Sequence, residues 1–112
     1  NHKMANTFKL KTKANVGVTT VGIYTAPAAT TTVVIGITMA NTSGSGVNVG
    51  VGITRAGTTE DVKLLKNAPI PQGSSLEFMA GNKIVLEATD TVTVDSDTNN
   101  SIDAALTIME IT

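Results

Sequence analysis

The chain has 112 residues and a mass of 11.5 kDa, with a formal net charge of −1, 41% hydrophobic, 15% charged and 3% aromatic residues, and no cysteine. This length suits one compact domain, and the lack of cysteine excludes disulfides, thiolate metal sites and thiol nucleophiles. The near-neutral charge provides no basic surface of the kind that binds nucleic acid. No apolar run approaches the roughly 20 residues that cross a bilayer, so we expect a soluble protein that binds neither nucleic acid nor a membrane.

Charge is distributed unevenly along the chain. Residues 1–56 contain five cations and no acid, whereas residues 57–112 contain three lysines and nine acids. One interpretation is that the basic first strand lies beside an acidic segment of the same chain or of a sister subunit. The alternative is a polar interface with a different partner.

Valine, isoleucine and threonine account for 40 of the 112 residues, which favours sheet throughout. The first four residues, Asn1 to Met4, have the character of an expression scar, and they contain the chain's one histidine, His2. We therefore expect a single domain over residues 5–112. From Thr7 to Val18 apolar and polar residues alternate, which predicts a half-buried strand. Its buried face would carry Phe8, Leu10, Thr12, Ala14, Val16 and Val18, and its other face Lys9, Lys11 and Lys13.

The rest of the chain predicts eight further short strands separated by turns rich in Gly, Pro, Asn and Ser, and no helix. The third of the nine strands is expected to bury Val33, Ile35, Ile37 and Met39. The eight ranges are 21–24, 31–41, 47–54, 61–66, 75–79, 83–87, 91–95 and 102–111.

Two features of these strands are unusual. Gly50 and Gly52 alternate with valines inside the fourth strand, which indicates either close approach by another group or a bulge. The segment from Asn67 to Gly73 contains Pro69 and Pro71, which suit an extended connection rather than a central strand.

The fold class that follows is all-β: a single antiparallel β-sandwich, jelly-roll-like, with about nine short strands. Its core is thin, because Phe8, Tyr24 and Phe78 are the only aromatic residues, and we place both phenylalanines inside. Aliphatic side chains bury less area per residue, so we expect association with copies of the same chain to add stability. An assembly would also cover exposed edge strands.

Little catalytic chemistry is available in the sequence. A serine nucleophile needs a base beside it, and the one histidine belongs to the segment interpreted as a scar. The acid pairs Glu60 with Asp61 and Asp95 with Asp97 could in principle share a proton, but they fall in predicted turns and strand ends where acids are solvated. We expect no enzyme activity and no cofactor. A sugar site and a single-strand nucleic-acid site are disfavoured by the shortage of exposed aromatic residues.

The segment from Asp95 to Asp103 comes nearest to a metal motif. Asp95, Asp97 and Asn99 alternate like the opening of a calcium loop. The pattern then fails, because Asn100 and Leu106 occupy the positions of the glycine and the terminal glutamate. We interpret it as an Asx-rich turn and expect no metal, with calcium as the alternative.

The order of several segments resembles small virion proteins of tailed bacteriophages. These segments are Tyr24-Thr25-Ala26-Pro27-Ala28, Thr31 to Ile35, Ala40 to Ser43, Leu64 to Glu77 and Gly81 to Val94, and the likeness runs over residues 20–112. The resemblance implies a β-sandwich used as a capsid decoration (cement) protein or as part of a tail or fibre, often as a trimer. It carries over no catalytic residue.

We therefore expect a homotrimeric decoration protein that stabilises the phage head, present in the virion and in the host cytoplasm during assembly. The alternative is a tail-tip or fibre module that binds a host-surface glycan. The row Lys9, Lys11 and Lys13 is the candidate contact with an acidic surface of the major capsid protein, another virion protein or a sister subunit.

Overall fold

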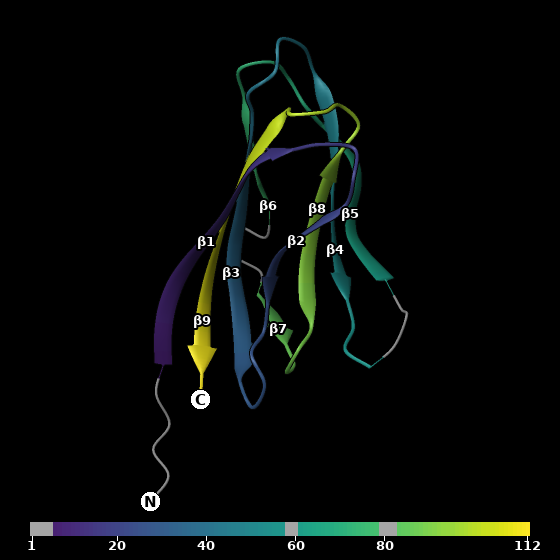
Figure 1. Ribbon diagram of the computed structural model, residues 1–112. Coiled ribbons are helices and arrows are strands. Elements are labelled where there is room, and N and C mark those ends of the chain that lie inside the picture. The colour runs from purple at the N-terminus through teal and green to yellow at the C-terminus, as the bar shows by residue number, and fades with distance from the viewer. Residues whose placement is uncertain (1–5, 58–60, 79–82) are drawn as a thin grey trace, which may run out of the picture.

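The computed structural model describes residues 6–57, 61–78 and 83–112. These residues form two antiparallel sheets packed face to face (Figure 1), so the predicted all-β sandwich is confirmed. None of these residues is helical, and none belongs to a helix that could span a membrane. The proposed scar, Asn1 to Met4, lies outside the described residues.

Nine strands make up the two sheets, and all nine were expected within a few residues of their observed bounds. They are β1 (Asn6–Val16), β2 (Val21–Thr25), β3 (Thr31–Asn41), β4 (Val47–Thr54), β5 (Asp61–Ile70), β6 (Ser75–Phe78), β7 (Ile84–Leu86), β8 (Thr91–Ser96) and β9 (Ile102–Ile111).

The strand order is that of a jelly roll. One sheet has the order β1-β9-β3, with β6 and β7 both pairing with β3, and the other has the order β2-β8-β4-β5. Strands β1 to β4 alternate between the sheets, β4 and β5 are neighbours in one sheet, and β6 and β7 both lie in the other, so the chain crosses the sandwich at most of its connections. The pairs β1 with β9, β2 with β8, β3 with β6 and β7, and β4 with β5 form a long antiparallel ribbon that wraps around the core.

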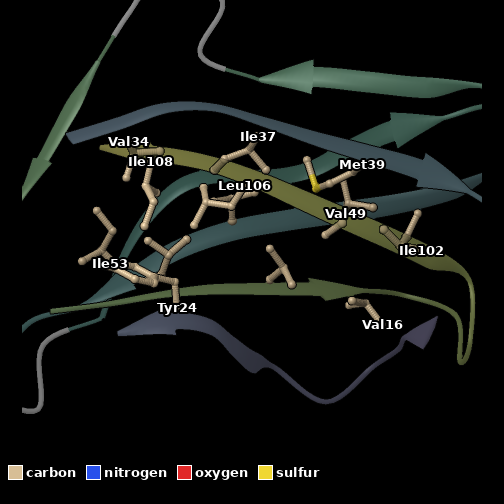
Figure 2. Close-up of a cluster of buried hydrophobic side chains, with 14 of the residues drawn as sticks. Val16, Tyr24, Val34, Ile37, Met39, Val49, Ile53, Ile102, Leu106 and Ile108 are labelled. Carbon is tan, nitrogen blue, oxygen red and sulfur yellow. The ribbon is translucent and has the colours of Figure 1, made fainter. Parts of the chain in front are cut away.

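The core lies between the sheets and is almost entirely aliphatic. Figure 2 shows Val34, Ile37 and Met39 of β3 and Ile102, Leu106 and Ile108 of β9 directed into the space between the sheets. Valines of β4 and β8 meet them from the other side. Tyr24 is the one aromatic side chain that is buried, although only the two phenylalanines were expected inside, and Phe78 is half-buried against the core.

A bulge in β3 changes which side chains are buried. Val33 and Ile35 were expected inside, but both are only partly buried and Val34 is in the core instead. The register between β3 and β9 shifts between Val34 and Gly36, and an inserted residue turns the following side chains to the other face. The expectation therefore holds for Ile37 and Met39, which lie beyond the bulge.

Gly50 and Gly52 of β4 have both of the features that the sequence suggested, close approach by another group and a bulge. A Cβ on Gly50 would lie 2.5 Å from Oδ1 of Asp95, and one on Gly52 would lie 2.9 Å from the carbonyl oxygen of Val62. The register between β4 and β5 also shifts at this point. Glycine thus allows β5 and β8 to approach β4 closely.

The edge strand β5 is longer than expected. It continues through Asn67 and Pro69 to Ile70, with Pro69 opposite Asn48 of β4. Proline is tolerated here because β5 is the last strand of its sheet, where a missing N–H removes no ladder bond on the open side. Asn67 takes up the local irregularity with a positive φ of 56°.

Substitution of Gly52 tests this close packing. We expect Gly52→Ala to lower the free energy of unfolding by about 1–3 kcal/mol, because the new Cβ forces a backbone carbonyl to move. Gly44→Ala is the control, since a Cβ there meets no atom within 4 Å. Urea denaturation followed by circular dichroism measures both; equal stabilities would contradict the proposed clash.

Candidate interaction surface

The row of Lys9, Lys11 and Lys13 lies on the inner side of β1, contrary to expectation. These residues pair across the ladder with Ile108, Leu106 and Ala104, whose side chains point into the core. Because β1 is the edge strand of its sheet, this inner side lies at the margin of the sandwich rather than at its centre. Lys9 and Lys13 are therefore exposed, with 42% of the Lys9 side chain accessible, while Lys11 is partly buried.

The opposite side of β1 carries the side chains that the sequence placed in the core. Phe8 is 68% exposed and Leu10 is 64% exposed, and Val18, beyond the strand, is also exposed. The prediction that these three residues are buried is wrong, whereas the burial of Val16 is confirmed.

A bulge near the end of β1 explains why Val16 is buried while Phe8 and Leu10, which belong to the same alternating pattern, are exposed. The register between β1 and β9 shifts between Lys13 and Val16, and Asn15 has a positive φ of 58°. The backbone N–H of Asn15 donates a hydrogen bond to Oδ1 of Asp103, 3.0 Å away. The bulge exchanges the faces of the strand, so Val16 points inward while Phe8 points outward.

Lys9 belongs to a polar cluster at the margin of the core. Its Nζ lies 2.9 Å from Oε1 of Glu110, a buried carboxylate. The hydroxyl of Tyr24 donates to Oε2 of Glu110 at 2.6 Å and is itself 2.8 Å from Oγ1 of Thr32. Each oxygen of the buried carboxylate thus has a donor, which is what makes its burial tolerable. The basic strand does lie beside an acid of the same chain, so that interpretation is confirmed for Lys9.

This cluster changes the pKa of both buried groups. Hydrogen bonds from Tyr24 and Lys9 hold the pKa of Glu110 below its ordinary value despite burial. Burial, together with the bond to Glu110, raises the pKa of Tyr24 to about 12. Glu110 is therefore ionised and Tyr24 protonated at neutral pH.

The acids between Asp95 and Asp103 are bound to separate partners. Asp95 accepts from the hydroxyl of Thr20, Asp97 from the amide of Asn48, and Asp103 from the amide of Asn15. In the described part of the chain no three acidic or histidine side chains lie close enough together to hold a metal ion. The segment forms a turn that carries the chain from β8 in one sheet to β9 in the other.

Of the other acid pair considered for catalysis, Glu60 with Asp61, the structure describes only Asp61. Glu60 lies outside the described residues, and Asp61 accepts a hydrogen bond from the hydroxyl of Thr54 at 2.7 Å. This bond ties the start of β5 to the end of β4.

A second charged cluster, which was not expected from the sequence, joins two connections at one end of the sandwich. The guanidinium of Arg55 lies 2.6 Å from Oε1 of Glu87 and 3.2 Å from the carboxylate of Asp90. Burial acts to raise the pKa of Asp90, but hydrogen bonds from the amides of Ala56 and Glu87 and from Arg55 hold it below its ordinary value. A signal was present, since Arg55 is the one cation between residues 14 and 62.

Beside this cluster is an open cavity of about 360 Å³. Its walls are aliphatic side chains of β4, β5 and β7, with Arg55, Glu87 and Asp90 on the polar side. The charged groups are engaged with one another or with backbone amides, so the cluster's visible role is to fix the loops.

Comparisons with known proteins support the fold but not a family. No family model matches the sequence, and no curated protein does. Solved structures do match. A chain in the capsid structure of Helicobacter pylori bacteriophage KHP30 is 11% identical, with 98% of this chain and 94% of that chain covered and a TM-score of 0.57.

Two further structures match with comparable sequence identity and TM-score. A chain of the cyanophage Pam1 capsid asymmetric unit is 13% identical, with 99% and 89% of the two chains covered and a TM-score of 0.53. A chain of the disulfide-linked pili of Bacillus endospore appendages is 15% identical, with 96% and 86% covered and a TM-score of 0.56. The fold is thus shared with virus capsid chains and with a pilus chain.

Removal of the tyrosine hydroxyl tests the polar cluster. We expect Tyr24→Phe to cost about 1–3 kcal/mol of unfolding free energy, because one oxygen of the buried Glu110 carboxylate loses its donor. Thr25→Val, which removes an exposed hydroxyl from the same strand, is the control and should cost less. Guanidinium denaturation at pH 7 measures the unfolding free energy of both variants. Equal losses would show that the Tyr24–Glu110 hydrogen bond stabilises the fold no more than an exposed hydroxyl does.

The cluster also predicts how stability depends on pH. Because the folded-state pKa of Glu110 lies below its usual value of 4.5, its ionisation stabilises the fold fully above that pH. The contribution is lost as the pH falls through the folded-state value. We expect Glu110→Gln to be less stable than the wild type at pH 7 but to lose less stability on acidification below about pH 4.5. Glu77→Gln, at an exposed position of β6, is the control; parallel acid profiles for wild type and Glu110→Gln would refute this role.

Proposed function

We propose that this chain is a non-enzymatic structural protein of a bacteriophage virion, and that it acts as a trimeric decoration protein that stabilises the head by bridging neighbouring capsomers. The observation that carries the proposal is the jelly roll itself, because phage capsid chains with this fold match it over nearly the full length of both chains. The order of segments in the sequence, which resembles tailed-phage virion proteins, points the same way.

The chemistry of the described residues fits a structural role. Of the carboxylates considered for catalysis, Asp61, Asp95 and Asp97 accept hydrogen bonds from neighbouring strands and loops and thereby hold the sandwich together. The buried ones, Glu110 and Asp90, are neutralised by Lys9 and Arg55. These charges are used to fix the fold and the ends of its loops.

The lysine row supplies the proposed contact with the head. Lys9 is already paired with Glu110, so Lys11 and Lys13 are the members that offer positive charge to a partner. Both project from an edge strand, at the margin of the sandwich, where a neighbouring protein can reach them. An acidic patch on the major capsid protein would complement them and speed association.

Copy number in the virion tests the proposal. Quantitative mass spectrometry of purified virions of the phage that encodes this chain should give an abundance comparable with that of the major capsid protein. A few copies per particle would instead support a tail or fibre component that binds a host-surface glycan. Absence from the virion would overturn the virion assignment and turn attention to a pilus-like appendage.

Charge reversal tests the lysine contact. We expect Lys11→Glu/Lys13→Glu to bind undecorated heads at least about tenfold more weakly than the wild type, and the wild-type affinity to fall as salt rises. The matched control is Lys63→Glu/Lys66→Glu, which makes the same charge change on β5 of the other sheet. Equal loss of binding in both variants would attribute the effect to net charge and remove the assigned role of the row.

A further inference from the structure

The outer face of the β1-β9-β3 sheet carries a row of apolar side chains that crosses the strands. Phe8 of β1 lies opposite Met109 of β9, Met109 lies opposite Val33 of β3, and Val33 lies opposite Val85 of β7. We call these four residues the apolar row. All four are on the side of the sheet away from the core, because the residues that follow them, Lys9, Glu110, Val34 and Leu86, are on the inner side.

The row is exposed most at its two ends. Phe8 at one margin is 68% exposed and Val85 at the other margin is 59% exposed, while Val33 and Met109 between them are partly buried. Leu10, which is 64% exposed, widens the row along β1. Exposed aliphatic and aromatic side chains that adjoin one another mark an interaction site more often than isolated ones do.

Charge is nearly absent from this face. Among the described strand residues that point outward from this sheet, only Glu77 and Asp103 are charged. Both lie towards the other end of the sheet, level with Thr38 and Ala40 of β3. Depletion of charge around aromatic residues and methionine is typical of the core of a protein interface.

The size of the face suits contact with another protein. Three strands of this sheet, β1, β9 and β3, are 10 or 11 residues long. At a spacing of about 4.8 Å they present roughly 500 Å², before side-chain relief and the short strands β6 and β7 are counted. A standard interface buries about 800 Å² on each partner. The other sheet of the sandwich covers only the inner side, so none of this area is used by the described fold itself.

We propose that the apolar row is the contact between copies of this chain, with the Phe8 end of one copy packed on the Val85 end of the next. The two ends differ, one being a large aromatic side chain on β1 and the other a small aliphatic one on β7. Unlike ends favour a head-to-tail contact, which closes into a ring when the rotation allows it. The ring has three members if the trimer proposed above is correct, and this inference rests on that proposal for its stoichiometry.

A copy of the same chain fits the row better than a charged capsid surface does. The row offers no charge for an acidic partner to complement, whereas the lysine row on the inner side of the same strand does. A second copy presents another uncharged apolar surface, which is the kind of surface that packs favourably against the row. Burial of these side chains also compensates for the thin aliphatic core.

Disulfide trapping tests the contact directly, because these 112 residues include no cysteine. Phe8 and Val85 are three strand spacings apart in one chain, about 14 Å, which is beyond the roughly 7 Å that a disulfide spans. A bond in the variant Phe8→Cys/Val85→Cys therefore joins two copies. After mild oxidation we expect covalent trimers on a non-reducing gel, and monomers from Phe8→Cys and Val85→Cys alone.

The single variants separate this contact from a two-fold one. Dimers from either single variant would mean that identical ends meet and would overturn the head-to-tail contact. Monomers alone from the paired variant would overturn it as well. The appearance of covalent rings of another size would support the contact and refute the trimer.

A charge placed beside the row provides an independent measurement. We expect Leu10→Glu to weaken self-association at least about tenfold in analytical ultracentrifugation, because burying an unpaired carboxylate is unfavourable. Val18→Glu, at an exposed position beyond the end of β1 that is remote from Phe8, is the control and should associate like the wild type. A monomeric wild type, or equal association of wild type and Leu10→Glu, would overturn the inference.

The two proposals can fail separately. Trapped rings together with absence from virions would support the contact between copies and refute the virion function. High copy number in virions without trapped rings would support the function and refute the contact.

Discussion

The register of β1 on β9 is the constraint on which the surface chemistry of this protein depends. Side chains of a strand alternate between faces, so a slip of one residue would exchange the lysines with Phe8 and Leu10. With Phe8 opposite Met109, the cationic row faces the margin of the core and the apolar row faces away from the sandwich. Both proposed interaction surfaces are consequences of that one pairing.

Two local features hold the register. At one end of β1 the ammonium group of Lys9 meets the buried carboxylate of Glu110, and a slipped strand would leave that charge without its cation. At the other end the bulge at Asn15 lets Val16 enter the core opposite Ile102. A buried charge and a buried valine thus fix the strand at both ends, and the side chains between them are free to serve contacts outside the chain.

The fold class could be predicted from the sequence because it depends on repeated local signals. Alternation, β-branched composition and turn residues recur along the whole chain, and an error at one strand leaves the count of nine unchanged. The bounds of β9 were predicted correctly because its side chains alternate without interruption, and the extra residues of both bulges lie in its partners β1 and β3. The close packing around Gly50 and Gly52 of β4 could also be predicted, since glycine inside a strand has few structural explanations.

The faces of β1 and β3 could not be predicted, for a common physical reason. Each strand contains a bulge, and one extra residue inverts the pattern beyond it without any change in the alternation itself. Asn15 does carry a signal, because asparagine tolerates a positive φ better than most residues, but many asparagines in the chain do not mark a bulge. The Arg55 cluster escaped for another reason: it joins connections that are distant in sequence, and only the jelly-roll crossings bring them together.

The arrangement of β1 allows two contacts to be made at the same time. Its lysines and its apolar side chains are on opposite faces of one edge strand, so a copy bound to the apolar row does not cover Lys11 or Lys13. Self-association through the outer face would order β1, which contributes only Val16 to the buried core. An ordered strand holds its lysines in place, and less conformational entropy is then lost when they bind an acidic surface. Assembly of the proposed ring would therefore strengthen the proposed attachment to the head, beyond the gain from presenting several lysine rows together.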